Sequence, residues 1–232
     1  MVSICMAVKN GELFIREQLE SILPQLGVND ELIISDDHSI DSTINIVKEF
    51  SDLRIKTITN PGQGIVDNFE NAIRHSSGDK IFLADQDDVW VKDKIEKMCL
   101  HLDRFNVVIC DCLIVDRYLN AEPNSFFEIN NSGKGLIKNI IRNSYMGCCM
   151  AFRRNILNKI LPFPRNIPMH DLWIGLVAEI HYSVYFLPEQ LVLYRRHSTN
   201  ASSGHRQSAR SIKAKMNTRL ILVKNLLRMA YA

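Results

Sequence analysis

Apolar runs alternate with helical patterns through the first 85 residues, and this order constrains the fold more than any other feature of the chain. Strands are predicted at 2–8, 32–34, 55–58 and 81–84, with helices between them at 13–26, 41–50 and 65–75. Such a βαβαβαβ order requires right-handed crossovers and builds a mostly parallel, doubly wound sheet. The sequence therefore predicts an α/β fold.

The rest of the chain follows a less regular pattern. Strands are predicted at 107–115, 147–152, 182–186 and 191–194, and helices at 135–142, 155–161 and 171–180. With 232 residues, of which 46% are hydrophobic and 23% charged, the chain can form one large domain with a short appendage. We expect an irregular α+β half after the parallel sheet.

Several classes of protein and site are not expected from this sequence. None of the six cysteines belongs to a C-x-x-C pair, so we expect reduced thiols and no structural zinc. The first residues lack a basic stretch followed by a long apolar run, and no segment approaches about eighteen uninterrupted apolar residues. We therefore expect a cytoplasmic protein without a signal peptide, a membrane span or a nucleic-acid partner.

Acidic residues gather where two of the four predicted parallel strands end. These clusters are Asp36-Asp37 and Asp85-Gln86-Asp87-Asp88, and ligands of doubly wound sheets bind beyond the carboxyl ends of the strands. Carboxylates that meet there repel one another unless a cation lies between them. The D-x-D spacing suits Mg²⁺ or Mn²⁺, which prefer oxygen ligands and leave places for phosphate. The alternative is an acidic turn that caps the following helix.

The residues that follow the predicted strands also help to distinguish between classes of nucleotide-binding protein. A carboxylate such as Asp37 can accept a hydrogen bond from a base N–H or a ribose hydroxyl, or it can cap the next helix. The segment 60–64 is similar in composition to a dinucleotide-binding loop, but Asp67 occupies the third glycine position. A dehydrogenase is therefore disfavoured, and the absence of a P-loop motif excludes a kinase of that class.

Six short motifs follow one another along residues 1–204. They are 2–11 (VSICMAVKNG), 36–39 (DDHS), 78–90 (GDKIFLADQDDVW), 147–152 (GCCMAF), 170–173 (HDLW) and 194–200 (YRRHSTN). In order and spacing they resemble the family 2 glycosyltransferases, and D-Q-D-D-x-W is similar to members that build bacterial surface polysaccharides, including rhamnosyltransferases. The resemblance implies a GT-A fold, a nucleotide-binding half at 1–90, an acceptor half at 91–204 and a tail at 205–232.

The resemblance also implies an activity and a cofactor. The expected reaction moves a sugar from a nucleoside diphosphate sugar, with UDP or dTDP, to an acceptor hydroxyl in O-antigen or capsule synthesis, and it uses Mn²⁺ or Mg²⁺. The acceptor is a saccharide or a lipid-linked saccharide. A homo-oligomer is compatible with the sequence, as are two other functions: a sugar nucleotidylyltransferase and a non-catalytic subunit that binds nucleotide sugars.

Individual residues take roles from the same resemblance. Ala7 and Lys9 match base-contacting positions, with backbone contacts expected at Lys9 because it replaces a frequent Tyr. Asp37 matches the base-binding carboxylate, Asp85 the ribose contact at the edge of the metal site, and Asp87 the direct metal ligand. His197 can complete the metal shell and Arg195 and Arg196 can meet the diphosphate, although a solvated basic run is the alternative.

The expected chemistry needs a base as well as a cation. A divalent ion stabilises the charge that develops on the diphosphate, and the attacking hydroxyl must give its proton to a carboxylate. Asp171 matches the family's base position, whereas its alternative role is to cap the helix at 171–180. One base and no covalent nucleophile imply inversion of the anomeric configuration.

The end of the chain is basic and amphipathic. After Glu189 there is no Asp or Glu, and nine Lys or Arg follow. Ile212, Met216, Leu220, Val223 and Leu227 recur at helical spacing on one face. The sequence predicts a helix over about 206–228 that lies on an anionic membrane, or that packs on its own domain or on a second subunit.

Overall fold

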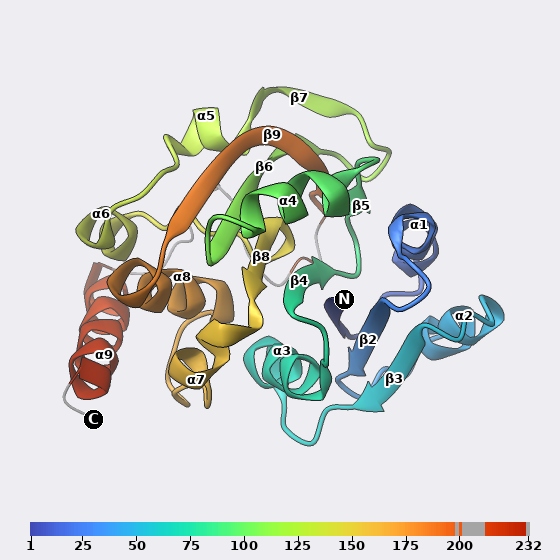
Figure 1. Ribbon diagram of the computed structural model, residues 1–232, viewed down its shortest axis with the longest axis horizontal. Helices are drawn as coiled ribbons and strands as arrows, with labels where there is room; N and C mark the ends of the chain where they lie inside the picture. Colours follow the sequence, from blue (N-terminus) through green and yellow to red (C-terminus); the bar gives the residue numbers. More distant parts are fainter. Residues whose placement is uncertain (198–199, 201–211, 231–232) are drawn as a thin grey trace.

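The computed structural model describes residues 1–197, 200 and 212–230, which form a curled mixed sheet with helices packed around it (Figure 1). The nine strands run in the order β3-β2-β1-β4-β8-β6-β9-β5, and β7 pairs with β6. The predicted α/β class is confirmed. The order β3-β2-β1-β4 is all parallel, so its crossovers bring the carboxyl ends of these strands to one edge.

The first half agrees closely with the predicted order. Its strands are β1 (Val2–Val8), β2 (Glu31–Asp36), β3 (Ile55–Thr59) and β4 (Lys80–Asp85). Its helices are α1 (Ile15–Ile22), α2 (Thr43–Glu49) and α3 (Gly64–His75). The helix predicted at 13–26 ends early in a 3₁₀ turn, Leu23–Gln25, because Pro24 has no N–H to continue the α-helical ladder. The two central strands β1 and β4 are almost wholly buried, as their continuous apolar runs require.

The second half contains elements that the pattern did not predict. These are the two-residue strand β5 (Val89–Trp90), β7 (Ala121–Ser125) and the helix α5 (Phe126–Asn130). A capping box starts α5, since Ser125 accepts from the Glu128 N–H while the Glu128 carboxylate accepts from the Ser125 N–H. The sequence S-F-F-E is a capping-box pattern, but the apolar run that follows it is too short to predict a helix.

The remaining elements lie near their predicted positions. The helices are α6 (Leu136–Ile141), α7 (Leu157–Ile160) and α8 (His170–His181), and the strand β6 spans Val107–Val115. Helix α4 (Lys94–Leu102) is the helix that follows the acidic cluster at 85–88. The strand predicted at 147–152 begins instead as a 3₁₀ turn, Gly147–Cys149, and becomes strand β8 only over Met150–Arg153. The end of α7 is followed by proline-rich chain that leads to α8.

One prediction of two separate strands was wrong. The segments 182–186 and 191–194 belong to a single strand, β9 (Val184–Arg195), which runs parallel to β6. Its register shifts where Cys110 faces Leu187 but Asp111 faces Gln190, so Pro188 and Glu189 bulge out of the ladder. Pro188 is tolerated there because a bulged residue need not donate a ladder hydrogen bond.

The tail forms helix α9 (Ile212–Ala230), while 206–211 of the predicted helix lie outside the described residues. Leu222 and Leu226 bury their side chains against the domain, close to α6. The predicted apolar face points elsewhere, because Met216, Leu220, Val223 and Leu227 are exposed. Among the helices described, none has the length and apolarity needed to cross a membrane.

Candidate functional site

A cavity of about 360 Å³ opens at the carboxyl ends of β1 and β4, between the two halves of the sheet. Strand ends, α3 and the start of α8 all contribute to its wall. The lining residues are Ala7, Val8, Lys9, Asp37, Gly64, Ile65, Asn68, Asp85, Gln86, Asp87, Met146, Gly147, Cys148, Met169, His170, Asp171, Tyr194 and Asn200. Six of the residues singled out in the sequence therefore face one space, namely Ala7, Lys9, Asp37, Asp85, Asp87 and Asp171.

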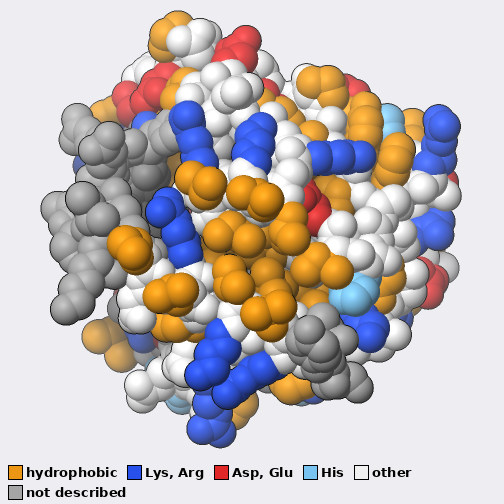
Figure 2. Space-filling model, turned by 90° about the vertical axis from the view of Figure 1, so that its left-hand side faces the viewer, with side chains coloured by type: hydrophobic (Ala, Val, Ile, Leu, Met, Phe, Trp, Pro, Cys, Tyr) orange, Lys and Arg blue, Asp and Glu red, His pale blue; other side chains and the backbone are white. Residues whose placement is uncertain are grey.

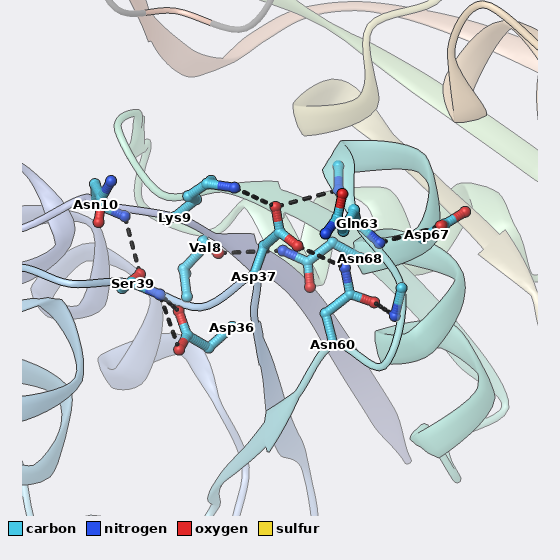
Figure 3. A network of polar contacts seen from close by, with 12 residues as sticks. Val8, Lys9, Asn10, Asp36, Asp37, Ser39, Asn60, Gln63, Asp67 and Asn68 are labelled. Atoms are coloured by element: carbon cyan, nitrogen blue, oxygen red, sulfur yellow. Dashed lines mark hydrogen bonds and ion pairs between the residues drawn. The ribbon is translucent and has the colours of Figure 1, made fainter.

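Asp37 is the centre of a polar network at one end of this cavity (Figure 3). Its buried carboxylate accepts hydrogen bonds from Lys9 Nζ at 2.8 Å, Asn60 Nδ2 at 2.9 Å and the Gly64 N–H at 3.2 Å. Burial acts to raise the pKa of Asp37, but these donors outweigh it and lower the pKa below its ordinary value. Asp37 is therefore an ionised, firmly oriented acceptor.

Lys9 and Gln86 tie together the ends of β1 and β4. The Lys9 N–H donates to Gln86 Oε1 at 2.8 Å, and Gln86 Nε2 donates to the Lys9 carbonyl at 3.0 Å. Both backbone groups of Lys9 are thus engaged within the protein. Its side chain, which is more than half exposed, pairs with Asp37 instead. Lys9 therefore lies beside the expected base position, but the group available to contact a base is its ammonium group and not a free backbone group.

Asn68 is a cavity residue that the sequence did not single out. It projects from α3, and its Nδ2 donates to the Val8 carbonyl at 3.1 Å. Its Oδ1 is buried and has no hydrogen-bond partner among the described residues. A buried acceptor without a partner is costly, so a ligand donor such as a base N–H would satisfy it. Only the fold reveals this residue, because a helical Asn carries no motif.

The acidic cluster after β4 carries uncompensated negative charge. Burial raises the pKa of Asp85 to about 8, and the nearby charges of Asp87 and Asp171 act in the same direction. Asp88 is fully buried, and burial together with Asp87 and Asp85 raises its pKa well above the ordinary value. Its Oδ1 accepts from the Arg195 N–H, whereas Oδ2 has no hydrogen-bond partner in the described part of the chain. Such a cluster is a poor arrangement without a cation.

Asp87 meets a residue more than a hundred positions away. Its Oδ2 lies 2.8 Å from His197 Nε2 and accepts from Asn200 Nδ2 at 3.0 Å. The His197 ring packs on Phe14, and the His197 N–H donates to Asn200 Oδ1. The structure therefore brings Asp87 and His197 together, as the predicted metal shell requires. Asn200 joins them, although the sequence reasoning gave it no role.

These donor groups fit a hard divalent cation. The carboxylates of Asp85 and Asp88 and the Cys148 thiol offer ligand atoms within 4.8 Å of one another. That thiol, whose pKa is raised by its hydrogen bond with Cys149 and by burial, is a poor ligand for a hard cation. Asp85 and Asp87 line the cavity, and Asp87 is the carboxylate that meets the His197 imidazole. Carboxylate oxygens with one imidazole suit Mn²⁺ or Mg²⁺ better than a soft metal. One fixed positive charge nearby is that of Lys94, which is buried over the Trp90 ring, donates to the Cys148 carbonyl at 2.7 Å and lowers the pKa of Asp85.

Asp171 lies in the first turn of helix α8 and also lines the cavity. Its Oδ1 accepts from the Leu172 N–H at 2.6 Å and its Oδ2 from the Gly147 N–H at 3.1 Å. Burial raises the pKa of Asp171 to about 6, although the two backbone donors oppose this shift. The carboxylate is held in place yet titrates close to neutrality, which is the property required of a general base.

His170 is a second residue that the sequence left without a role of its own. Its ring is buried, stacks on Phe69 at 3.9 Å between centroids and lines the cavity. Burial lowers its pKa to about 3, so the imidazole is neutral and has one N–H donor and one acceptor nitrogen. Neither nitrogen has a partner among the residues that the structure describes. The ring can therefore bind a hydroxyl group of a ligand.

The structure does not bring Arg195 to the cavity, contrary to the role expected for it. Its guanidinium is buried and hydrogen-bonds to the Asp87 carbonyl at 2.9 Å, the Arg117 carbonyl at 2.7 Å and the Glu17 carboxylate. Arg196 pairs with Glu122 at 3.2 Å and also lies outside the cavity wall. Arg195 instead fixes the loop that carries Asp87 and Asp88. Sequence alone cannot distinguish an arginine that supports a site from one that faces it.

The comparisons with known proteins agree with this geometry. The family model described as "Glycosyl transferase family 2" matches residues 3–161. A dTDP-rhamnosyl transferase, RfbG of Shigella flexneri, is 30% identical over 95% of this chain and 79% of its own length. A UDP-Glc:alpha-D-GlcNAc-diphosphoundecaprenol beta-1,3-glucosyltransferase, WfgD of Escherichia coli, is 28% identical over 79% of this chain and 72% of its own length.

Solved structures share the fold at low identity. TarS (residues 1–349) of S. aureus in complex with UDP-GlcNAc superimposes with a TM-score of 0.74 at 18% identity, over 97% of this chain and 66% of that one. The mannosyltransferase PcManGT of Pyrobaculum calidifontis, in complex with GDP-Man and Mn²⁺, gives 0.68 at 20% identity, over 86% and 58%. This chain thus spans about two thirds or less of those structures. The predicted GT-A fold is confirmed, and the chain belongs to glycosyl transferase family 2.

Proposed function

We propose that the chain is an inverting, metal-dependent glycosyltransferase that moves a sugar from a UDP- or dTDP-sugar to an acceptor hydroxyl. The observation that carries this proposal is that Asp171, Asp85 and Asp87 all line one cavity, where burial and the nearby charges of Asp87 and Asp171 raise the pKa of the Asp85 carboxyl. A candidate base and a candidate cation site thus face the same space. Residues 1–90 supply the nucleotide side, and 91–204 supply the acceptor side.

The nucleotide fits the end of the cavity that contains Ala7 and Asp37. Asp37 is ionised and oriented there, and the free Oδ1 of Asn68 supplies a second acceptor. Uracil and thymine each present an N–H between two carbonyl groups, so an acceptor suits their N–H and the Lys9 ammonium suits a neighbouring carbonyl. The diphosphate then extends toward Asp85, Asp87 and His197.

The cation site completes the donor side. Asp87 and His197 would hold Mn²⁺ or Mg²⁺ directly, with Asp85 beside them at the ribose end. The bound ion would stabilise negative charge on the departing diphosphate. Asp85 and Asp88 contribute the surrounding negative charge, and Lys94 limits it. Arg195 positions the loop that carries these carboxylates through its hydrogen bond to the Asp87 carbonyl.

Asp171 removes the proton of the attacking hydroxyl. The two backbone donors from Leu172 and Gly147 hold its carboxylate, and one lone pair on each oxygen is left for the acceptor. The neutral His170 ring beside it can orient the same hydroxyl or its neighbour, since both ring nitrogens lack a protein partner. In-line attack by a hydroxyl from this wall inverts the anomeric carbon.

The relatives suggest where the product is used. RfbG is a rhamnosyl transferase that uses a dTDP donor, and the printed name of WfgD specifies an acceptor linked to diphosphoundecaprenol. We extend these properties to the present chain as a role in bacterial surface-polysaccharide synthesis, with a saccharide or lipid-linked saccharide as acceptor. Met146, Gly147 and Met169, which line the cavity together with Asp171, are the residues we assign to acceptor contact.

The experiment that tests this function uses a panel of UDP- and dTDP-sugars with and without EDTA. We expect Mn²⁺-dependent release of nucleoside diphosphate from one donor, and EDTA should abolish it. With an acceptor present, the NMR coupling constant of the new anomeric proton should report inversion. Donor binding without any turnover would instead indicate a non-catalytic binding subunit. Formation of a nucleoside triphosphate and a sugar 1-phosphate from the donor when pyrophosphate is added would indicate a nucleotidylyltransferase.

Activity should depend on pH through Asp171. Because the pKa of this carboxyl is raised to about 6, the base is protonated and inactive below that pH. We expect kcat/KM at saturating Mn²⁺ to fall about tenfold per pH unit on the acid side and to level off above neutrality. A bound cation would move this limb to lower pH, not to higher pH. A profile in which activity rises as pH falls from 7 to 5 would contradict the assignment.

A further inference from the structure

Helices α6 and α9 lie side by side on one face of the molecule, far apart in sequence (Figure 1). Arg219 of α9 donates to the Ile141 carbonyl at the end of α6 at 2.7 Å. Leu222 and Leu226, which are 1% and 6% exposed, anchor α9 to the domain. The helix is therefore docked along one side, and its orientation is fixed.

Docking leaves a second apolar face of α9 in solvent. At 100° per residue, Met216, Leu220, Val223 and Leu227 fall within an arc of roughly 60°, and the anchoring residues lie roughly 110° away. Ile137 and Ile141 of α6 are exposed on the adjoining helix. We call these six side chains the α6–α9 patch; their exposed fractions run from 37% to 73%. Folded proteins rarely leave so many large apolar side chains together in water without a use for them.

Positive charge surrounds the α6–α9 patch. The described part of α9 carries exposed Lys224 and Arg228, and the α6 segment carries Lys134, Lys138 and Arg142. Neither 131–142 nor 190–232 contains any Asp or Glu. Figure 2 shows hydrophobic side chains gathered at the centre of this face, with Lys and Arg side chains on several sides of them and an acidic side chain at one edge. Positive charge therefore predominates where the apolar surface meets water.

We propose that the α6–α9 patch docks on an anionic lipid bilayer. The apolar side chains would enter the boundary between headgroups and acyl chains, and the surrounding cations would meet anionic headgroups. A second copy of this chain is a poorer occupant, because a two-fold contact through the same patch would bring two cationic rims together. The proposed membrane-binding surface thus includes α6 as well as the tail helix α9. It exists only while α9 is docked on the domain.

The position of the patch also suits a membrane-bound acceptor. Helix α8 runs from Asp171 at the cavity to Glu179, which accepts hydrogen bonds from the Gly135 N–H at 2.9 Å and the Tyr145 hydroxyl at 2.6 Å beside α6. Eight residues of α-helix span about 12 Å. A lipid-linked acceptor would then reach Asp171 from the bilayer that the patch contacts. This step alone rests on the proposed function.

The test measures vesicle flotation of the full chain without any donor, so catalysis does not enter. We expect binding to phosphatidylglycerol–phosphatidylcholine vesicles, little binding to pure phosphatidylcholine, and loss of binding at high salt. Two double variants, Ile137→Ser/Ile141→Ser and Leu220→Ser/Leu227→Ser, should each weaken binding by about tenfold or more. The control Val28→Ser/Leu53→Ser removes two exposed apolar side chains elsewhere and should bind as the wild type does.

The α6 variant decides between the proposal and its rivals. If only α9 entered the bilayer after leaving the domain, Ile137→Ser/Ile141→Ser would bind like the wild type, and the proposal would be wrong. Absence of binding to anionic vesicles would also overturn it, as would a dimer in analytical ultracentrifugation that the patch variants dissociate. Circular dichroism and the Tm of each variant check that loss of binding does not follow from unfolding.

Discussion

Replacing Asp171 by Asn should lower kcat by ~10²–10⁴-fold and leave the donor Kd unchanged, because the amide cannot take the proton of the attacking hydroxyl. The side chain stays the same size, so the cavity keeps its shape. Steady-state kinetics and calorimetric titration with the donor in Mn²⁺ would measure the two quantities. Asp111→Asn is the matched control, since Asp111 is also buried and accepts backbone N–H bonds from Cys112 and Phe127, but does not line the cavity.

The Asp171→Asn variant also permits a measurement that does not depend on catalysis, namely the free energy of unfolding as a function of pH. The pKa of Asp171 is raised from 3.8 to about 6 in the folded chain, so the folded state holds this proton more tightly than the unfolded state. The stability that the protonated form contributes is present below pH 3.8 and is lost as pH rises through about 6. Asp171→Asn should therefore gain free energy of unfolding relative to the wild type across that interval, by up to about 3 kcal/mol.

Two results would separate a base from a structural cap. If Asp171 only capped α8, the variant would keep most of its kcat, whatever the pH dependence of its stability. If it were a nucleophile, the product would retain the anomeric configuration of the donor. Loss of kcat together with a pH-dependent gain in stability is expected when a buried carboxylate with a raised pKa takes part in the reaction.

The first half of the fold was readable from the sequence because each element carries its own signal. Strands β1, β2 and β4 are largely buried runs rich in apolar residues, and the edge strand β3 combines half-buried Ile with exposed polar residues. Glycine, proline or acidic turns separate these strands from the helices. The second half was harder because tertiary contacts decide it. The bulge at Pro188 joins two predicted strands into β9, and the pairing with β6 that stabilises this strand cannot be seen locally.

The residues of the candidate site also fall into those that local sequence signals predict and those that tertiary contacts decide. Acidic residues at strand ends could be predicted, since parallel strands bring their carboxyl ends together by geometry. Asn68, Asn200, Lys94 and the neutral state of His170 could not, because their roles depend on burial and on partners distant in the sequence. Arg195 shows the converse, since a basic residue near a diphosphate site serves instead to hold the backbone of Asp87.

Asp87→Asn should abolish the Mn²⁺ dependence of the enzyme and reduce turnover by roughly 10²- to 10³-fold, because it removes a negatively charged ligand from the cation that stabilises the leaving group. Donor binding in Mn²⁺ should weaken as well. In EDTA, however, the variant and the wild type should bind the donor equally, since the ion through which Asp87 acts is then absent. Calorimetric titration of UDP or dTDP into both proteins, with and without Mn²⁺, completes this cycle.

A control variant and a second ligand variant test whether the effect of Mn²⁺ on donor binding is specific to the proposed cation site. Asp67→Asn removes a carboxylate that accepts from the Gln63 N–H at 3.3 Å but does not line the cavity, so it should leave the Mn²⁺ increment intact. His197→Ala should reduce the increment less than Asp87→Asn does, because a neutral ligand contributes less charge. If Asp87→Asn kept near wild-type rates while Asp85→Asn lost the increment, the ion would lie between Asp85, Asp88 and Cys148 instead. The contact between Asp87 and His197 would then be a hydrogen bond that joins the Asp87 loop to the chain just after β9.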